Sequence, residues 1–168
     1  VEDAIRPNLT ANFEALLMAS VLHPAMLLYL DQPQSFGPSS RAGKRQGRGL
    51  NENLARELLE LHTLGVGADY AQTDVRQMAE LLTGLTYDAS AGTRFDPRRA
   101  EPGAETVLGQ TYDGEGLEVI RRALGDLARR PETAAHIARK LAVHFVSDSP
   151  DPALVAGAVA AVKAALGM

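Results

Sequence analysis

Apolar side chains recur every three or four residues along most of the chain, which is the spacing of a helix that buries one face. In residues 73–83, for example, Val75, Met78, Ala79 and Leu82 fall on one side. The same spacing predicts helices over about 8–22, 25–30, 51–64, 73–83, 117–130, 131–146 and 151–166. The pattern therefore indicates a mainly α fold, a multi-helix domain with orthogonal or bundle-like packing.

Two stretches lack this spacing. Residues 31–50 combine Pro, Gly and Ser with four basic side chains, and we expect a long basic loop there. Residues 85–115 contain short β-prone pieces between Gly, Pro and Asp, which favours irregular structure with one small β-hairpin around residues 85–112. All of these elements are expected to form a single domain over residues 1–168.

Composition narrows the classes of protein and of site. The 168 residues are 45% hydrophobic and 23% charged, which fits a compact domain and excludes a disordered chain. The chain has no cysteine, so disulfides, thiolate metal sites and thiol nucleophiles are excluded. A net charge of -4 argues against nucleic acid as a partner, and no apolar run reaches the roughly 20 residues of a membrane span. We see no metal-ligand or nucleophile–base spacing and therefore expect no metal and no cofactor.

The densest polar cluster lies in the third predicted helix. At about 100° per residue, Glu52, Arg56 and Glu60 share one face with Glu57, whereas His62 falls among the leucines of the opposite face. Within a regular helix His62 is therefore too far around the axis to pair with Glu57 or Glu60. We expect this histidine to pack in the core and to hydrogen-bond to the backbone.

The polar face of this helix allows two interpretations. Glu52, Arg56 and Glu60 are spaced as an ordinary ladder of surface ion pairs. Alternatively, the excess of carboxylates forms a buried polar seam that binds a cation, holds an acid of raised pKa, or pairs with the basic residues of the preceding loop.

That loop carries Arg41, Lys44, Arg45 and Arg48 with no acidic residue among them. Four positive charges without a counter-ion are able to bind phosphate or an acidic partner. No aromatic residue interleaves with them, so we do not expect a stacking platform for single-stranded nucleic acid. The alternative is an ordinary solvated loop.

Longer motifs resemble a known family. The run NENLARELLELHTLGV from Asn51 to Val66, together with Tyr70, Thr73-Asp74-Val75 and Leu82-Thr83-Gly84, is similar to the signature of the bacterial DUF1800 family. Residues 25–31, 106–109 and 131–141 also fit that family. The resemblance implies a shared structural or functional role for the polar residues of the signature, which are Asn51, Glu52, Asn53, Arg56, Glu57, Glu60, His62, Thr63 and Asp74.

The resemblance also implies that the chain is a central fragment of a longer bacterial protein, in a family of which many members look exported. It brings no established activity. We therefore expect a helical module of unknown function that either binds a protein partner or the remainder of its own chain, or has a structural role. If upstream helices normally cover its faces, apolar patches are exposed in this fragment, and it is able to dimerise through them.

Two alternatives stay open. The first is an enzyme, with hydrolysis as the candidate reaction, whose site is shared between the polar cluster of residues 51–74 and residues upstream of this chain. Its acid–base and electrostatic groups would come from Arg56, Glu57, Glu60, His62 and Asp74. The second is anion or phosphate binding by the basic residues 41–48.

Overall fold

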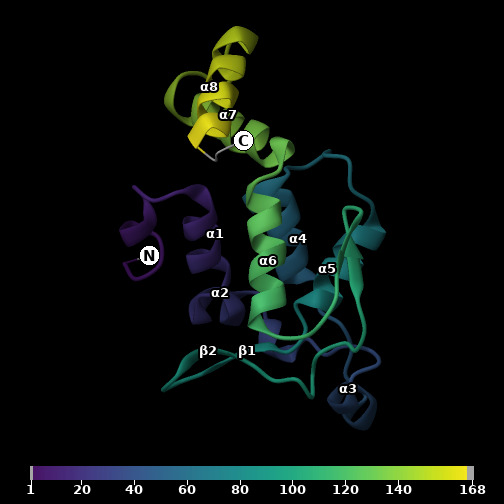
Figure 1. Ribbon diagram of the computed structural model, residues 1–168. Helices are drawn as coiled ribbons and strands as arrows, with labels where there is room; N and C mark the ends of the chain where they lie inside the picture. The colour runs from purple at the N-terminus through teal and green to yellow at the C-terminus, as the bar shows by residue number, and fades with distance from the viewer. Residues whose placement is uncertain (1, 166–168) are drawn as a thin grey trace.

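The computed structural model describes residues 2–165 and has a mainly α fold (Figure 1). The protein is 54% helical, and the described residues form eight α-helices and two small antiparallel sheets of two strands each. This confirms the mainly α fold class expected from the apolar spacing. An orthogonal or bundle-like arrangement of the helices stays a prediction.

The helices follow the predicted order with two changes, a short extra helix at residues 41–46 and a change of helix type at residue 57. Two short 3-10 helices are η1 (Arg6–Asn8) and η2 (Gln32–Gln34), and η3 (Glu57–Thr63) is a π-helix. The α-helices are α1 (Phe13–Val21), α2 (Pro24–Tyr29), α3 (Arg41–Gln46), α4 (Asn53–Arg56), α5 (Gln72–Leu81), α6 (Leu117–Ala128), α7 (Pro131–Phe145) and α8 (Pro152–Ala165).

Helix α6 runs through the middle of the molecule, between α1 and α2 on one side and α4 and α5 on the other (Figure 1). Its buried side chains recur at helical spacing, as the sequence predicted for this segment. The largest fully buried side chains of the core include Leu27, Leu54, Leu58, Leu59, Met78, Leu82, Leu85, Ile120 and Leu124.

Residues 85–112 form two hairpins where one was expected. Strand β1 (Leu85–Asp88) pairs with β2 (Gly92–Phe95), and β3 (Glu105–Val107) pairs with β4 (Gln110–Tyr112), both antiparallel. The second hairpin turns through Leu108 and Gly109, both with positive φ, which is the backbone of a tight two-residue turn. The sequence analysis missed it because leucine rarely adopts this conformation.

Residues 31–50 differ from the expected long loop because they contain η2 and α3. The Oγ of Ser40 accepts a hydrogen bond from the backbone N–H of Gly43 at 3.0 Å and caps the start of α3. Gly47, at a φ of 62°, ends the helix in the left-handed conformation. With no apolar stripe along its six residues, α3 gave no periodic signal.

Helices α7 and α8 form a hairpin at the end of the molecule opposite α3 (Figure 1). None of the described side chains of α8 is fully buried, although Lys163 is its only charged residue. Phe145 and Val146, at the end of α7, are 76% and 62% exposed. Among residues 2–165, no helix combines the length and the apolar character that crossing a membrane requires.

Candidate functional site

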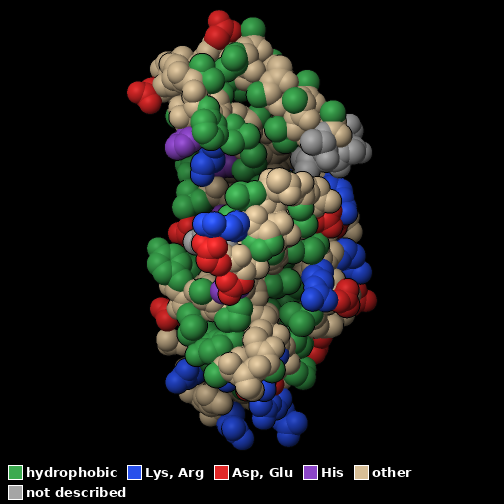
Figure 2. All heavy atoms as spheres, turned by 90° about the vertical axis from the view of Figure 1, so that its left-hand side faces the viewer, with side chains coloured by type: hydrophobic (Ala, Val, Ile, Leu, Met, Phe, Trp, Pro, Cys, Tyr) green, Lys and Arg blue, Asp and Glu red, His purple; other side chains and the backbone are tan. Residues whose placement is uncertain are grey.

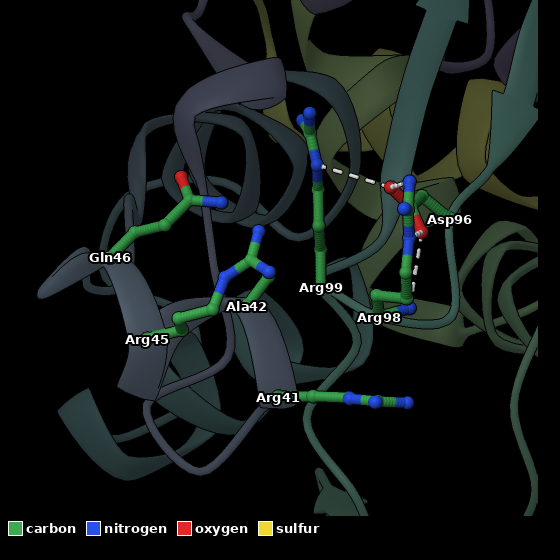
Figure 3. A pocket seen from close by; sticks show the side chains of 7 residues that line it. All are labelled: Arg41, Ala42, Arg45, Gln46, Asp96, Arg98 and Arg99. Atoms are coloured by element: carbon green, nitrogen blue, oxygen red, sulfur yellow. Dashed lines mark hydrogen bonds and ion pairs between the residues drawn. The ribbon is translucent and has the colours of Figure 1, made fainter.

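Four arginines from two segments line one cleft at the α3 end of the molecule (Figure 3). Arg41 and Arg45 belong to α3, whereas Arg98 and Arg99 lie in the turn that follows β2. The cavity has a volume of about 290 Å³, and its lining is completed by Ala42, Gln46 and Asp96. We call it the arginine cleft. In Figure 2, Lys and Arg side chains gather at this lower end of the molecule.

Main-chain hydrogen bonds join the two walls of the cleft. The backbone N–H of Ala42 donates to the carbonyl oxygen of Arg98 at 2.8 Å, and that of Gly37 donates to the carbonyl oxygen of Arg99 at 2.9 Å. Because Arg41 and Arg45 are four residues apart on α3, they project from the same side of that helix. These contacts bring segments that are distant in the sequence to one site.

Asp96 organises the wall formed by the turn. Its carboxylate is 6% exposed and accepts hydrogen bonds from Nε and Nη2 of Arg98, both at 2.9 Å. The Nε of Arg99 lies 3.4 Å from the same carboxylate. The hydrogen bonds from Arg98 hold the pKa of Asp96 below its usual range, so this carboxylate stays ionised and offsets one of the four positive charges.

Arg99 is held in place by two further contacts. Its Nη1 donates to the carbonyl oxygen of Pro33 at 2.8 Å, and its guanidinium lies 4.9 Å from the centre of the Phe36 ring. Arg48 stacks on the same ring at 5.5 Å and lies outside the lining of the cleft. The turn wall is therefore ordered without a ligand.

The α3 wall is different. Within residues 2–165, neither Arg41 nor Arg45 makes a hydrogen bond through its side chain or an ion pair. Each guanidinium therefore keeps five N–H donors for solvent or a ligand. Four guanidiniums and one carboxylate leave the cleft with a net charge of about +3.

The predicted polar face of residues 51–74 is also assembled, but its members bind each other. Glu52 Oε2 accepts hydrogen bonds from Nη2 of Arg56 at 2.6 Å and from Nε2 of Gln72 at 2.9 Å. Arg56 also donates to Oε1 of Gln72 at 2.9 Å, and its Nη1 lies 3.9 Å from Oε1 of Glu60. The result is a ladder of ion pairs extended onto α5.

The side chains of Asp74 and Asn51 form hydrogen bonds with backbone groups. Asp74 Oδ2 accepts from the N–H of Ala71 at 2.9 Å and caps α5, and its Oδ1 accepts from the N–H of Leu108 at 2.7 Å. It thus clamps the tight turn of the second hairpin onto α5. The side-chain amide of Asn51 donates to the carbonyl oxygen of Leu30 at 3.0 Å, and its Oδ1 accepts from the N–H of Asn53 at 2.9 Å.

The predicted helix over residues 51–64 becomes a π-helix at Glu57, which changes the positions expected from a regular helix. His62 and Glu57 are then one turn apart, and His62 Nδ1 donates to the backbone oxygen of Glu57 at 2.7 Å. The buried hydroxyl of Thr63 donates to the backbone oxygen of Leu58 at 2.7 Å in the same way. His62 is half-buried, so the backbone partner matches the expectation and the core position does not.

A family model described as "Protein of unknown function (DUF1800)" matches residues 1–165 of the chain. The chain belongs to the DUF1800 family. No curated protein and no solved structure matches it. The match confirms the resemblance carried by the run from Asn51 to Val66. In this DUF1800 chain, Asn51 and Asp74 of that signature bind backbone groups, and Arg56 binds Glu52.

A second cluster that the sequence analysis missed lies beside the second hairpin of the DUF1800 chain. Glu80, Glu101, Glu105 and Glu115 line a small cavity of about 10 Å³. Glu105 is 4% exposed, and its burial, together with the charges of the other three glutamates, raises its pKa to about 7. Among residues 2–165, no group of three or more His, Asp or Glu side chains is arranged to hold a metal ion.

The sequence analysis also missed the turn wall of the arginine cleft. Asp96, Arg98 and Arg99 lie in the segment that was expected to be irregular, and no periodic pattern marks them. The adjacent pair Arg98-Arg99 was not a distinguishing signal, because the chain also has adjacent arginines at 121–122 and 129–130. Of the four basic residues that were singled out, Arg41 and Arg45 line the cleft, whereas Lys44 and Arg48 do not.

Proposed function

We propose that this DUF1800 chain binds a small anion of the phosphate class in the arginine cleft. The observation that carries the proposal is the pair of unpaired guanidiniums on α3, Arg41 and Arg45, which share the cavity of about 290 Å³ with Arg98 and Arg99. Guanidinium forks match phosphate oxygens with two parallel hydrogen bonds. The proposal extends the anion-binding alternative for residues 41–48 to the turn formed by residues 96–99.

The side chains of one wall of the cleft are already held in position, which supports this proposal. Arg98 and Arg99 are already positioned by Asp96, Pro33 and Phe36, so a ligand does not have to immobilise those side chains. The two walls are joined through the backbone of Ala42, which limits how far they are able to separate.

Isothermal titration calorimetry with inorganic phosphate at low ionic strength measures this binding and tests the proposal. Arg45→Gln removes a charge inside the cleft, and Lys44→Gln, the matched control, removes the same charge from α3 outside the lining. We expect Arg45→Gln to weaken phosphate binding by about tenfold and Lys44→Gln by less than about twofold. Added salt is expected to weaken binding in the wild-type protein. Equal losses in the two variants, or no heat with phosphate, would contradict a defined site.

The exposed apolar side chains of the α7–α8 end favour a second candidate function, binding of a protein partner or of the remainder of its own chain. Phe145 and Val146 have the highest exposed fractions of these groups, and burying them on a partner is favourable by roughly 25 cal/mol for each Å² of apolar surface. Light scattering of the wild type and of Phe145→Ser tests self-association, the simplest form of this binding. A monomeric wild type would argue against dimer formation.

A catalytic role for the cluster of residues 51–74 stays a prediction. Glu57 is half-buried, and its carboxylate has no partner among residues 2–165. Glu57→Gln in the intact protein is the variant that tests it. A loss of hydrolytic turnover without a loss of stability would support the enzyme, and unchanged turnover would argue against it.

A further inference from the structure

The arginine cleft contains more positive charge than one phosphate group neutralises. Arg41, Arg45, Arg98 and Arg99 exceed the single carboxylate of Asp96 by about three charges. A phosphate monoester carries about 1.5 to 2 negative charges at neutral pH. Two linked phosphate groups bring roughly three, so a diphosphate matches the cleft more closely than a monophosphate does.

The donors are arranged as two separate sets. On α3, Arg41 and Arg45 have all of their N–H groups free within residues 2–165. On the turn, Arg98 uses Nε and Nη2 for Asp96 and keeps Nη1, and Arg99 uses Nη1 for Pro33 and keeps Nη2. In the view of Figure 3, Arg45 points up from α3 whereas Arg41 extends below Arg98, and Arg98 and Arg99 rise from the turn. A single phosphate bound to the free forks of α3 would leave the remaining donors of the turn without an anion.

The cleft is small for a ligand pocket. Its volume of about 290 Å³ lies at the small end of ligand pockets, which span roughly 300–1,000 Å³. Gln46 is the one uncharged polar side chain of the lining, so the anionic part of the ligand is what the cleft recognises. Asp96 already accepts hydrogen bonds from Nε and Nη2 of Arg98, so a ligand binds Arg98 through its remaining Nη1 group.

We propose that the ligand of the arginine cleft carries a diphosphate group, whose two phosphates are held by the arginines of α3 and of the turn together. This proposal rests on the anion site proposed above. The diphosphate group is shared by free pyrophosphate and by nucleoside diphosphates, and the experiment separates these two sources.

The experiment is a set of titrations of the full chain with phosphate, pyrophosphate, ADP, AMP and citrate at one ionic strength and without divalent cations. Citrate controls for charge, because it is a trivalent anion without phosphorus. We expect pyrophosphate to bind at least about tenfold more tightly than phosphate or citrate, since it engages both walls. ADP binding as tightly as pyrophosphate indicates a nucleotide, whereas weaker binding of ADP indicates free pyrophosphate.

Variants on each wall test the two-wall arrangement. We expect Arg98→Gln to weaken pyrophosphate binding more than phosphate binding, and so to remove most of the preference for pyrophosphate. If Arg98→Gln does not fold, Arg98→Lys is measured in its place, because lysine keeps the positive charge beside Asp96 but lacks the guanidinium fork. Arg94→Gln is the control, because Arg94 lies on β2 outside the cleft. Equal affinities for phosphate and pyrophosphate, or for citrate and pyrophosphate, would overturn the diphosphate while leaving the anion site in place. No binding of any of these anions would overturn both proposals.

Discussion

The arginine cleft and the polar cluster of residues 51–74 look equally rich in charge along the sequence, yet the fold treats them differently. In the cluster, Glu52, Arg56 and Asp74 are bound to neighbouring side chains or to backbone N–H groups. In the cleft, Arg41 and Arg45 make no such contact within residues 2–165. The density of polar residues along the sequence therefore does not tell which of them keep free donors after folding.

The acidic cavity is an intermediate case. Like the cleft it gathers charges of one sign, but Glu105 is buried and the cavity of about 10 Å³ has little room for a ligand. Burial, together with the charges of the neighbouring glutamates, favours the protonated form of this carboxyl, which is why the pKa of Glu105 rises to about 7. Four substitutions test these distinctions.

Asp74→Ala should have the largest effect. It removes the acceptors of two backbone N–H groups, those of Ala71 and Leu108. We expect the free energy of unfolding to fall by about 3–4 kcal/mol, measured by urea denaturation. Asp74→Asn keeps one acceptor oxygen and is expected to lose about half as much. A loss below about 1 kcal/mol in Asp74→Ala would show that this carboxylate is not a clamp.

Glu105→Gln should stabilise the protein in a pH-dependent way. The fold raises the pKa of this carboxyl from 4.5 to about 7, so its contribution to stability falls as the pH rises through that window and is lowest above pH 7. We expect a gain of about 2 kcal/mol in the free energy of unfolding at pH 8 and almost none at pH 4. The control is Glu118→Gln, since that side chain is 84% exposed. A gain that is the same at both pH values would contradict the raised pKa.

Arg41→Gln should affect binding without affecting stability. Its guanidinium has no partner within residues 2–165, so the free energy of unfolding is expected to change by less than about 0.5 kcal/mol. Phosphate affinity is expected to fall by about tenfold, which corresponds to about 1.4 kcal/mol. If chemical denaturation instead revealed a large loss of stability, Arg41 would be a structural residue like Arg56.

Glu60→Gln should have the smallest effect. Glu60 lies 3.9 Å from Arg56, and the two side chains are 36% and 41% exposed, so the unfolding free energy should change by less than about 0.5 kcal/mol. A second readout is available because burial, and to a smaller extent the charge of Glu60, raises the pKa of Tyr70. Spectrophotometric titration should show this pKa falling in the variant. An unchanged Tyr70 titration would mean that Glu60 does not act on this phenol.

The extent to which the sequence predicted the structure varies between elements. Helices α5, α6 and α7 could be predicted because each has an apolar stripe within ten or more consecutive residues. Helix α3 could not, because Ser40, Gly47 and hydrogen bonds to the distant residues 98–99 hold it in place of an apolar face. The π-helix at Glu57–Thr63 was missed because an angular analysis assumes one helix type throughout.

The sequence by itself determined the mainly α fold, the order of the helices and membership of the DUF1800 family. These properties are encoded in short contiguous stretches, where side-chain spacing decides which face is buried. Only the tertiary structure decided which charged residues stay free. Arg41 and Arg45 join Arg98 and Arg99 in one cleft because backbone hydrogen bonds connect two distant segments, whereas Asp74 is occupied by the turn at Leu108. Whether a polar group has a partner depends on contacts between such segments, which local spacing does not encode.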